Sequence, residues 1–232
     1  MSAGTEAPNN PLVPVAASAP QLPDFLRAKG GNALAGMDGF SGKDLIFPRL
    51  TLMQALSPMV GERKAREGDV MHSTTKAIIY PRVNESIGSP ISIVPVRLVK
   101  EWCHWASRVS KKGLLGRTTD PKHPIARKAR EQLEATRDGH KPNQQTDETY
   151  NETHAWIVID TNRDEPFVVS MSKGGIRESR AWASTIAAKG CEMFAQKYEL
   201  FAFYDKNKNN EYFWVFKTRL VGFVKDTAEF DL

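Results

Sequence analysis

Lysine, arginine and aromatic side chains form the part of this sequence best suited to a chemical role. Between residues 97 and 141 there are twelve Lys and Arg against five Asp and Glu, a local net charge of +7 in a chain whose total is +5. Trp102 and Trp105 lead directly into this basic stretch. Proteins that hold single-stranded nucleic acid pair a basic groove for phosphates with rings on which bases stack. The combination predicts a surface that binds single-stranded DNA without reading its sequence. Core packing of the rings and a solvated basic loop are the alternatives.

A second group of cations surrounds a glycine pair in the segment VVSMSKGGIRES, residues 168–179. Backbone N–H groups at the start of a helix attract anions, and Lys173, Arg177 and Arg180 would reinforce them. The alternative is a glycine turn that joins a buried strand to a packed helix. On the last predicted strand, alternation places Lys217 and Arg219 on one face. The predicted nucleic-acid-binding residues are Arg97, Trp102, Trp105, Arg108, Lys111, Lys112, Arg117, Lys122, Arg127, Lys128, Arg130, Lys173, Arg177, Arg180, Lys217 and Arg219.

Sequence signatures of the common catalytic classes are absent. There is no G-x-x-x-x-G-K-[ST], G-x-S-x-G, H-E-x-x-H or dinucleotide-binding glycine fingerprint. The five histidines have no metal-ligand spacing, and Cys103 and Cys191 form no C-x-x-C pair, so we expect reduced thiols, no metal site and no cofactor. We therefore predict a protein that is not an enzyme. The E-x-K spacing at Glu62 and Lys64 keeps a metal-dependent nuclease as an alternative.

The composition is typical of a soluble, folded protein. Hydrophobic residues make up 41% of the 232 residues, enough for a sizeable core. No stretch approaches the roughly 18 consecutive apolar residues of a membrane helix, and the first residues lack the order of a secretory signal. We expect a cytosolic protein without a membrane partner. Residues 1–23 have almost no charge and few large apolar residues, so we expect a disordered tail, followed by a single domain over residues 24–232.

Alternating and β-branched segments predict that strands dominate this domain. Pro48 suggests an edge position for the first strand, and Pro95 suggests an edge or a bulge in the longest one. Helical patterns cover residues 124–137, with Ile125, Ala129 and Leu133 on the apolar side, and residues 176–189. The β pattern breaks over residues 106–153, which we interpret as a basic insertion with a glycine loop at 110–116. Strands are predicted within residues 45–58, 68–73, 76–81, 89–105, 154–160 and 166–172 and as a final aromatic hairpin within 198–226. The fold class predicted is α+β, a twisted antiparallel sheet with two or three helices.

Three segments resemble phage-encoded single-stranded-DNA-binding proteins, including the RNA-polymerase cofactors of N4-related phages. They are FPRLTLMQALSP, PFVVSMSKGGIRESRAWASTIAAKG and YELFAFYDKNKNNEYFWVFKTRLVGFVKD, within residues 45–230. The resemblance implies non-catalytic binding of single-stranded DNA in the host cytoplasm, either at opened promoters with a phage RNA polymerase or on replication and recombination intermediates with replication proteins. A homo-oligomer stays one option for the protein, because the sequence does not determine the oligomeric state. Many phage proteins of this kind use an OB barrel whereas the cofactors differ, so an OB-like, partly closed barrel stays one option for the sheet.

A phage structural or assembly protein is the main competing interpretation. In that case the basic patch would meet acidic protein partners, and single strands would not be preferred over duplex. The C-terminal segment DTAEFDL carries Asp226, Glu229 and Asp231 around Phe230, fewer acids than the partner-recruiting acidic tails of many phage single-strand binders.

Overall fold

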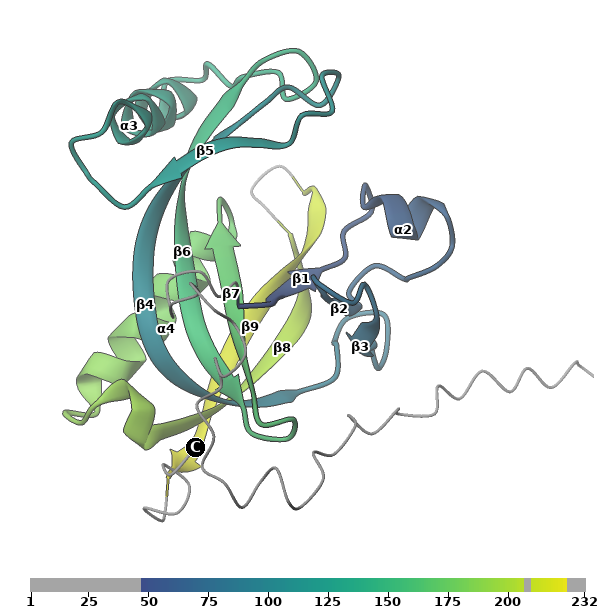
Figure 1. Cartoon of the computed structure of the whole chain (residues 1–232), viewed down its shortest axis with the longest axis vertical. Helices are drawn as coiled ribbons and strands as arrows, with labels where there is room; N and C mark the ends of the chain where they lie inside the picture. The colour runs from purple at the N-terminus through teal and green to yellow at the C-terminus, as the bar shows by residue number, and fades with distance from the viewer. Residues whose placement is uncertain (1–46, 207–209, 225–232) are drawn as a thin grey trace, which may run out of the picture. The chain divides into compact units, whose positions relative to one another are not determined.

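Nine strands form one curled, mixed sheet in the computed structural model, which describes residues 47–206 and 210–224 (Figure 1). The strand order is β3-β2-β1-β7-β6-β4-β8-β9, and β5 pairs with β4 outside this path. The strands are β1 Arg49–Leu52, β2 Val70–His72, β3 Ile78–Tyr80, β4 Ile91–Trp105, β5 Leu114–Thr118, β6 Thr149–Asp160, β7 Glu165–Ser172, β8 Gln196–Lys206 and β9 Tyr212–Phe223. With helices α2 Pro58–Gly61, α3 Pro124–Arg137 and α4 Gly175–Ala188 and the 3-10 turn Met193–Ala195, the α+β prediction is confirmed. The predicted tail, residues 1–23, lies outside the described residues.

Strand β4 is the longest element and organises the sheet. It pairs with β6 along most of its length, with β8 at its first three residues and with β5 at its last four. The register shifts between Pro95 and Arg97, so the predicted bulge is confirmed. Proline lacks the N–H that a ladder needs, and a bulge also bends and twists its strand. One strand can therefore serve two parts of the molecule, the curled sheet and the segment that carries β5 and α3 (Figure 1).

The predicted final hairpin is confirmed, but the predicted position of the first strand is wrong. Strands β6 and β7 pair antiparallel, as do β8 and β9. Strand β1 is not at an edge, because it pairs antiparallel with β2 and parallel with β7, the exception in an otherwise antiparallel sheet. Pro48 precedes the strand, where its missing N–H costs no ladder bond, and its carbonyl accepts a hydrogen bond from the N–H of Val168 at 2.8 Å.

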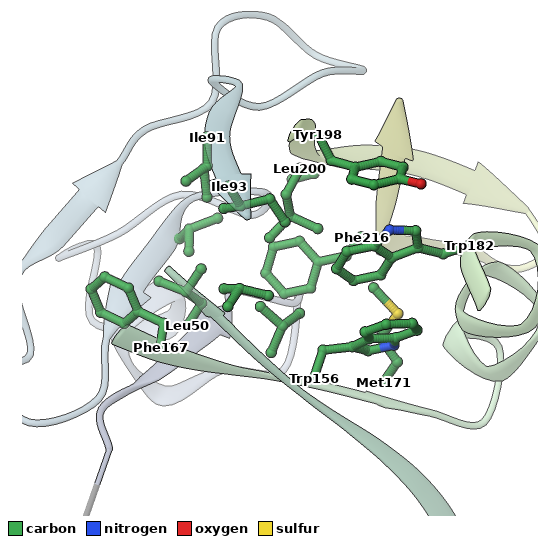
Figure 2. Packing of buried hydrophobic residues seen from close by; sticks show 14 of the residues in the cluster. Leu50, Ile91, Ile93, Trp156, Phe167, Met171, Trp182, Tyr198, Leu200 and Phe216 are labelled. Carbon is green, nitrogen blue, oxygen red and sulfur yellow. The ribbon is translucent and has the colours of Figure 1, made fainter. Parts of the chain in front are cut away.

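The main core lies between the sheet and α4 (Figure 2). Trp156 of β6 and Trp182 of α4 stack with ring centroids 3.9 Å apart, and Tyr198 of β8 meets Trp182 edge-on at 5.6 Å. Aromatic stacking adds to the free energy gained by burying these large rings. The helix predicted over 176–189 is confirmed as α4, whose buried residues include Trp182 and Ile186. Nothing in the described helices is long and apolar enough to cross a membrane.

A smaller core lies under α3, in the segment predicted to be an insertion. Trp102 of β4 packs against Ala126 and Ala129, with Ile125 and Tyr150 at the margin. The helix prediction is confirmed, but Leu133, assigned to its apolar side, is 47% exposed. Strand β5 lies where we predicted a glycine loop, and β6 begins at Thr149, inside the predicted insertion. Pairing with β4 supplies the hydrogen bonds here, and such tertiary pairing overrides weak local propensity.

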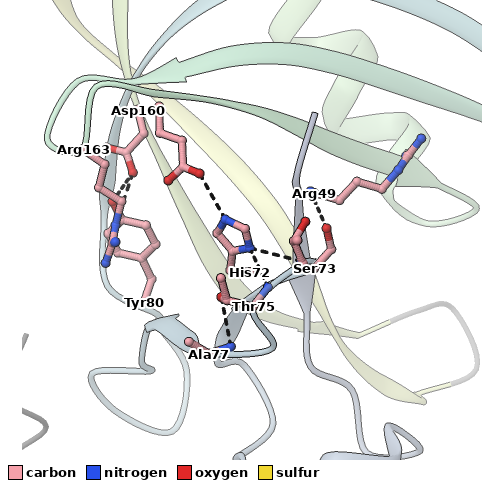
Figure 3. A network of polar contacts seen from close by, with 10 residues as sticks. Arg49, His72, Ser73, Thr75, Ala77, Tyr80, Asp160 and Arg163 are labelled. Atoms are coloured by element: carbon pink, nitrogen blue, oxygen red, sulfur yellow. Dashed lines mark hydrogen bonds and ion pairs between the residues drawn. The ribbon is translucent and has the colours of Figure 1, made fainter. Parts of the chain in front are cut away.

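A polar network fixes β2 and β3 against the β6–β7 hairpin (Figure 3). Asp160 is fully buried and accepts a hydrogen bond from the hydroxyl of Tyr80. Desolvation, and then this hydrogen bond to the carboxylate, raise the pKa of Tyr80. His72 Nε2 lies 3.1 Å from Glu165 Oε1, while its Nδ1 accepts from the N–H groups of Thr74 and Thr75 in the β2–β3 turn. The network satisfies a charge that would otherwise be too costly to bury.

Candidate nucleic-acid interface

A groove of about 1400 Å³ lies between α3 and the first turn of α4. One wall comes from α3 and the chain that follows it, and the other from α4 and the residue before it. Strand β1, the start of β6, the end of β7, the start of β9, Trp102 of β4 and Arg108 add to the lining. The groove therefore gathers segments that are far apart in the sequence, which the curl of the sheet brings together.

The charge of this groove is strongly positive. Among the described residues that line it, the carboxylates are Glu152 and Glu211. The cations that line it are Arg49, Arg108, Arg130, Arg137, Lys141, Lys173, Arg177 and Arg180. A concave surface lined by one sign of charge focuses its field and concentrates ligands of the opposite sign. The arrangement suits a polyanion.

Lys173 occupies the strand–glycine–helix corner that the sequence singled out. Its φ is +50°, in the left-handed region that non-glycine residues rarely adopt. Among the residues that the structure describes, none forms an ion pair with its ammonium group. Desolvation by the groove, and then the positive charge of Arg108, lower the pKa of Lys173 although the side chain is exposed. A bound anion would relieve the repulsion between these two cations.

The glycine pair at this corner has a packing reason. A Cβ atom on Gly174 would lie 2.9 Å from Cε2 of Phe213 and 3.1 Å from its Cζ, so the ring of β9 needs a glycine beneath it. The corner is thus a turn that joins β7 to α4, as the structural alternative describes, and anion binding there stays a prediction. The same turn places Lys173 at the groove.

Arg177 and Arg180 line the groove with their charges partly neutralised. Arg177 forms ion pairs with Glu178 at 2.9 Å and with Asp205 at 3.0 Å, and the hydrogen bond and charge of Glu178 raise its pKa. Arg180 lies 3.5 Å from Glu152. Both side chains remain more than half exposed, so each can still meet a phosphate.

A chain of hydrogen bonds links the groove to the core beneath α4. Glu152 Oε1 lies 3.0 Å from His154 Nε2, and His154 Nδ1 lies 2.7 Å from Ser179 Oγ. The order acid, histidine, serine resembles a hydrolase triad, but Ser179 is fully buried and also accepts the indole N–H of Trp156 at 2.8 Å. Because the hydroxyl has no access to a substrate, the chain fastens α4 to β6.

The two titratable members of this chain have shifted pKa values. Desolvation lowers the pKa of His154, outweighing the hydrogen bond and charge of Glu152, which act in the opposite direction. Desolvation alone would raise the pKa of Glu152, but the hydrogen bond and charge of Lys100, 2.8 Å away, dominate and lower it. His154 is therefore neutral and Glu152 ionised near neutral pH.

Six of the predicted binding residues line the groove. They are Trp102, Arg108, Arg130, Lys173, Arg177 and Arg180. Trp102 is 6% exposed and covered by α3, so its ring is a core residue and offers no face to a base. The five cations remain candidates for contact with phosphates.

The other ten predicted residues do not line the groove. Lys128 lies 3.3 Å from the hydroxyl of Tyr150 and 5.0 Å from the centre of its ring, and the exposed indole of Trp105 donates to Asn151. On β9, Lys217 pairs with Asp205 at 3.4 Å and Arg219 pairs with Glu199. The remainder lie on β4, on β5 or in the segment around α3, namely Arg97, Lys111, Lys112, Arg117, Lys122 and Arg127.

Sequence reasoning missed several lining residues. Arg137 and Lys141 belong to the basic stretch and could have been included on that ground. Arg49 could not have been predicted, because its position in the groove depends on the parallel pairing of β1 with β7 and on the hydrogen bond from its guanidinium to Ser170. Tyr212 was not singled out either: by strand alternation it shares a face with the buried Trp214, yet it is 60% exposed.

Carboxylates, histidines and cysteines do not gather in a metal-binding group. Within residues 47–206 and 210–224, no three of them are placed to hold an ion. Glu62 and Lys64, the pair that kept a nuclease as an alternative, form an exposed salt bridge of 2.7 Å beside α2. The expected absence of a metal and of a cofactor stays a prediction.

A protein-family model described as Pam3 phage gp34-like protein matches residues 15–232. The chain belongs to this family. The chain is thus a bacteriophage protein, as the resemblance implied, and the family description states no activity. Searches of curated proteins and of solved structures gave no significant match.

Proposed function

We propose that this phage protein binds single-stranded DNA, without catalysis and largely without sequence preference, in the groove between α3 and α4. The observation that carries the proposal is the charge of the groove, eight cations against two carboxylates among its described lining residues. Neutralising phosphates releases counterions, which drives binding of any nucleic-acid sequence.

A single strand fits this surface better than a duplex does. The groove is concave and bounded by helices, and duplex DNA resists bending over the dimensions of one protein domain. A single strand is flexible enough to follow the groove and can offer unpaired bases to exposed rings. We place this binding in the host cytoplasm, at opened promoters with a phage RNA polymerase or on replication intermediates with replication proteins.

The test is an anisotropy titration of a fluorescent oligo-dT with the full-length protein at several salt concentrations. The groove variant is Arg108→Ala/Lys173→Ala. The matched control is Lys64→Ala/Lys189→Ala, which removes the same charge from exposed positions outside the groove lining. A third variant, Lys111→Ala/Lys112→Ala/Arg117→Ala, removes cations of the 106–123 segment.

We expect the groove variant to weaken binding and to reduce the slope of log K against log salt by about 1.4, because each lost phosphate contact on a single strand contributes about 0.7. The control should keep the slope. Equal losses in the groove variant and the control would contradict the proposal, since binding would then follow net charge alone. A loss confined to the third variant would move the site to the 106–123 segment.

A further inference from the structure

The β8–β9 hairpin carries a ladder of three aromatic rings at the groove. Tyr204 of β8 stacks on Tyr212 of β9, with centroids 5.1 Å apart and planes 14° apart. Tyr204 also contacts Trp214, with the two ring centroids 5.2 Å apart and the two ring planes tilted by 42°. Trp214 is 3% exposed, Tyr204 is half-buried and Tyr212 is 60% exposed, so the ladder rises from the core to the solvent. Tyr212 and Trp214 both line the groove.

The base of this ladder is held rigidly. The side-chain amide of Gln54 donates to the carbonyl of Trp214 at 2.8 Å and accepts from its N–H at 3.1 Å. Gly68, with φ +83°, lies directly against the indole, because a Cβ there would be 2.7 Å from three of its ring atoms. Trp214 therefore fixes Tyr204, and Tyr204 supports one face of Tyr212. A ring that is already ordered loses little entropy when a base stacks on it.

We propose that Tyr212 is the stacking platform for an unpaired base of the bound strand, an inference that rests on the proposed function. Exposure decides among the aromatic residues of the groove. Trp102 is covered by α3, and Trp214 and Phe216 belong to the main core. Tyr150 and Phe213 also line the groove, but both are only partly exposed and Tyr150 is stacked on His104. Tyr212 combines a place in the groove lining, a supported ring and an exposed surface.

Stacking and phosphate contact have different salt signatures, which makes the inference testable. The measurement is the oligo-dT titration with wild type, Tyr212→Ala and Tyr212→Phe across salt, repeated with an abasic oligonucleotide of the same length. Loss of one stacked base should weaken oligo-dT binding by about 5- to 150-fold. The slope against salt should not change, because no phosphate contact is lost. Tyr212→Phe should bind like the wild type, since the phenyl ring keeps its face.

The abasic strand separates stacking from indirect effects. Wild type and Tyr212→Ala should bind it equally, because it offers no base to either protein. Thermal unfolding of Tyr212→Ala confirms the fold, which an exposed position should leave intact. If the wild type prefers single strands and Tyr212→Ala binds oligo-dT equally well, this inference is overturned while the proposed function stands. If the wild type does not bind single strands, both are overturned.

Discussion

Replacement of Lys173 by glycine should make the protein more stable and weaken its binding of DNA. Lys173 adopts φ +50°, a conformation that costs an L-residue about 1–2 kcal/mol and a glycine almost nothing. Glycine loses about 0.5–1 kcal/mol more chain entropy on folding, so the net gain is about 0.5–1 kcal/mol. For a chain of this size that gain raises the melting temperature by about 1–4 °C. The loss of one phosphate contact lowers the salt slope by about 0.7.

Lys76→Gly is the matched control for this variant. Lys76 has φ +60° in the turn between β2 and β3, is exposed, and does not line the groove. It should give the same gain in thermal stability without the change in salt slope. Thermal unfolding and the oligo-dT titration measure both quantities on the same samples. If Lys173→Gly destabilises the protein, the strain argument is refuted, and if it changes binding no more than Lys76→Gly does, Lys173 does not contact DNA.

Three further predictions concern the stability of the groove's supports. The free energy of unfolding should fall as pH drops below 6.5, because His154 binds its proton more weakly in the folded state than in the unfolded chain, and should fall further below pH 4.5 as Glu152, whose pKa is lowered by folding, is protonated. Urea unfolding measures this free energy at each pH, and between pH 7 and 5 it should depend less on pH in His154→Gln than in the wild type. An equal pH dependence in the two proteins would refute the role given to His154. Trp156→Phe should lower the free energy of unfolding by about 1 kcal/mol more than Trp182→Phe does, because Trp156 donates a hydrogen bond to Ser179 whereas the buried indole N–H of Trp182 has no hydrogen-bond partner among the described residues. Urea unfolding of both variants measures the difference, and a larger loss in Trp182→Phe would contradict the prediction. Gln54→Ala should destabilise by about 1–3 kcal/mol, because it leaves the backbone N–H and C=O of a buried residue without their partners; thermal melts that match the wild type would show that water replaces the amide.

Local features of the fold were predictable from the sequence because they depend on neighbouring residues. The helix over 176–189 ends at a glycine with φ +65°, and the aromatic hairpin follows alternation, so both predictions are confirmed. The interior position of β1 and the existence of β5 were not predictable, since each depends on a partner strand far away in the sequence. Pro48 suggested an edge strand because the prediction placed it inside the strand. The strand begins at Arg49, so Pro48 lies outside it, and the sequence does not show this boundary.

The candidate site was predictable in kind but not in detail. The basic stretch and the cationic corner were visible as charge, and six of the predicted residues meet in one groove. The exposure of each aromatic ring could not be predicted, because strand alternation shows which residues share a face of the sheet but does not show which face a helix covers. Trp102 is covered by α3, whereas Tyr212 at the end of its strand extends beyond the core.

The affinity of the wild-type protein for a single strand relative to its duplex tests the central claim most directly. A labelled 30-mer and its duplex, titrated with EDTA at low and high salt, give both affinities and their salt dependence. We predict tighter binding of the single strand, weakening steeply with salt, with the DNA intact. Equal affinity for the two forms, or none for either, would contradict the account and favour an assembly role with acidic protein partners. Loss of the DNA when Mg²⁺ replaces EDTA would instead indicate a nuclease.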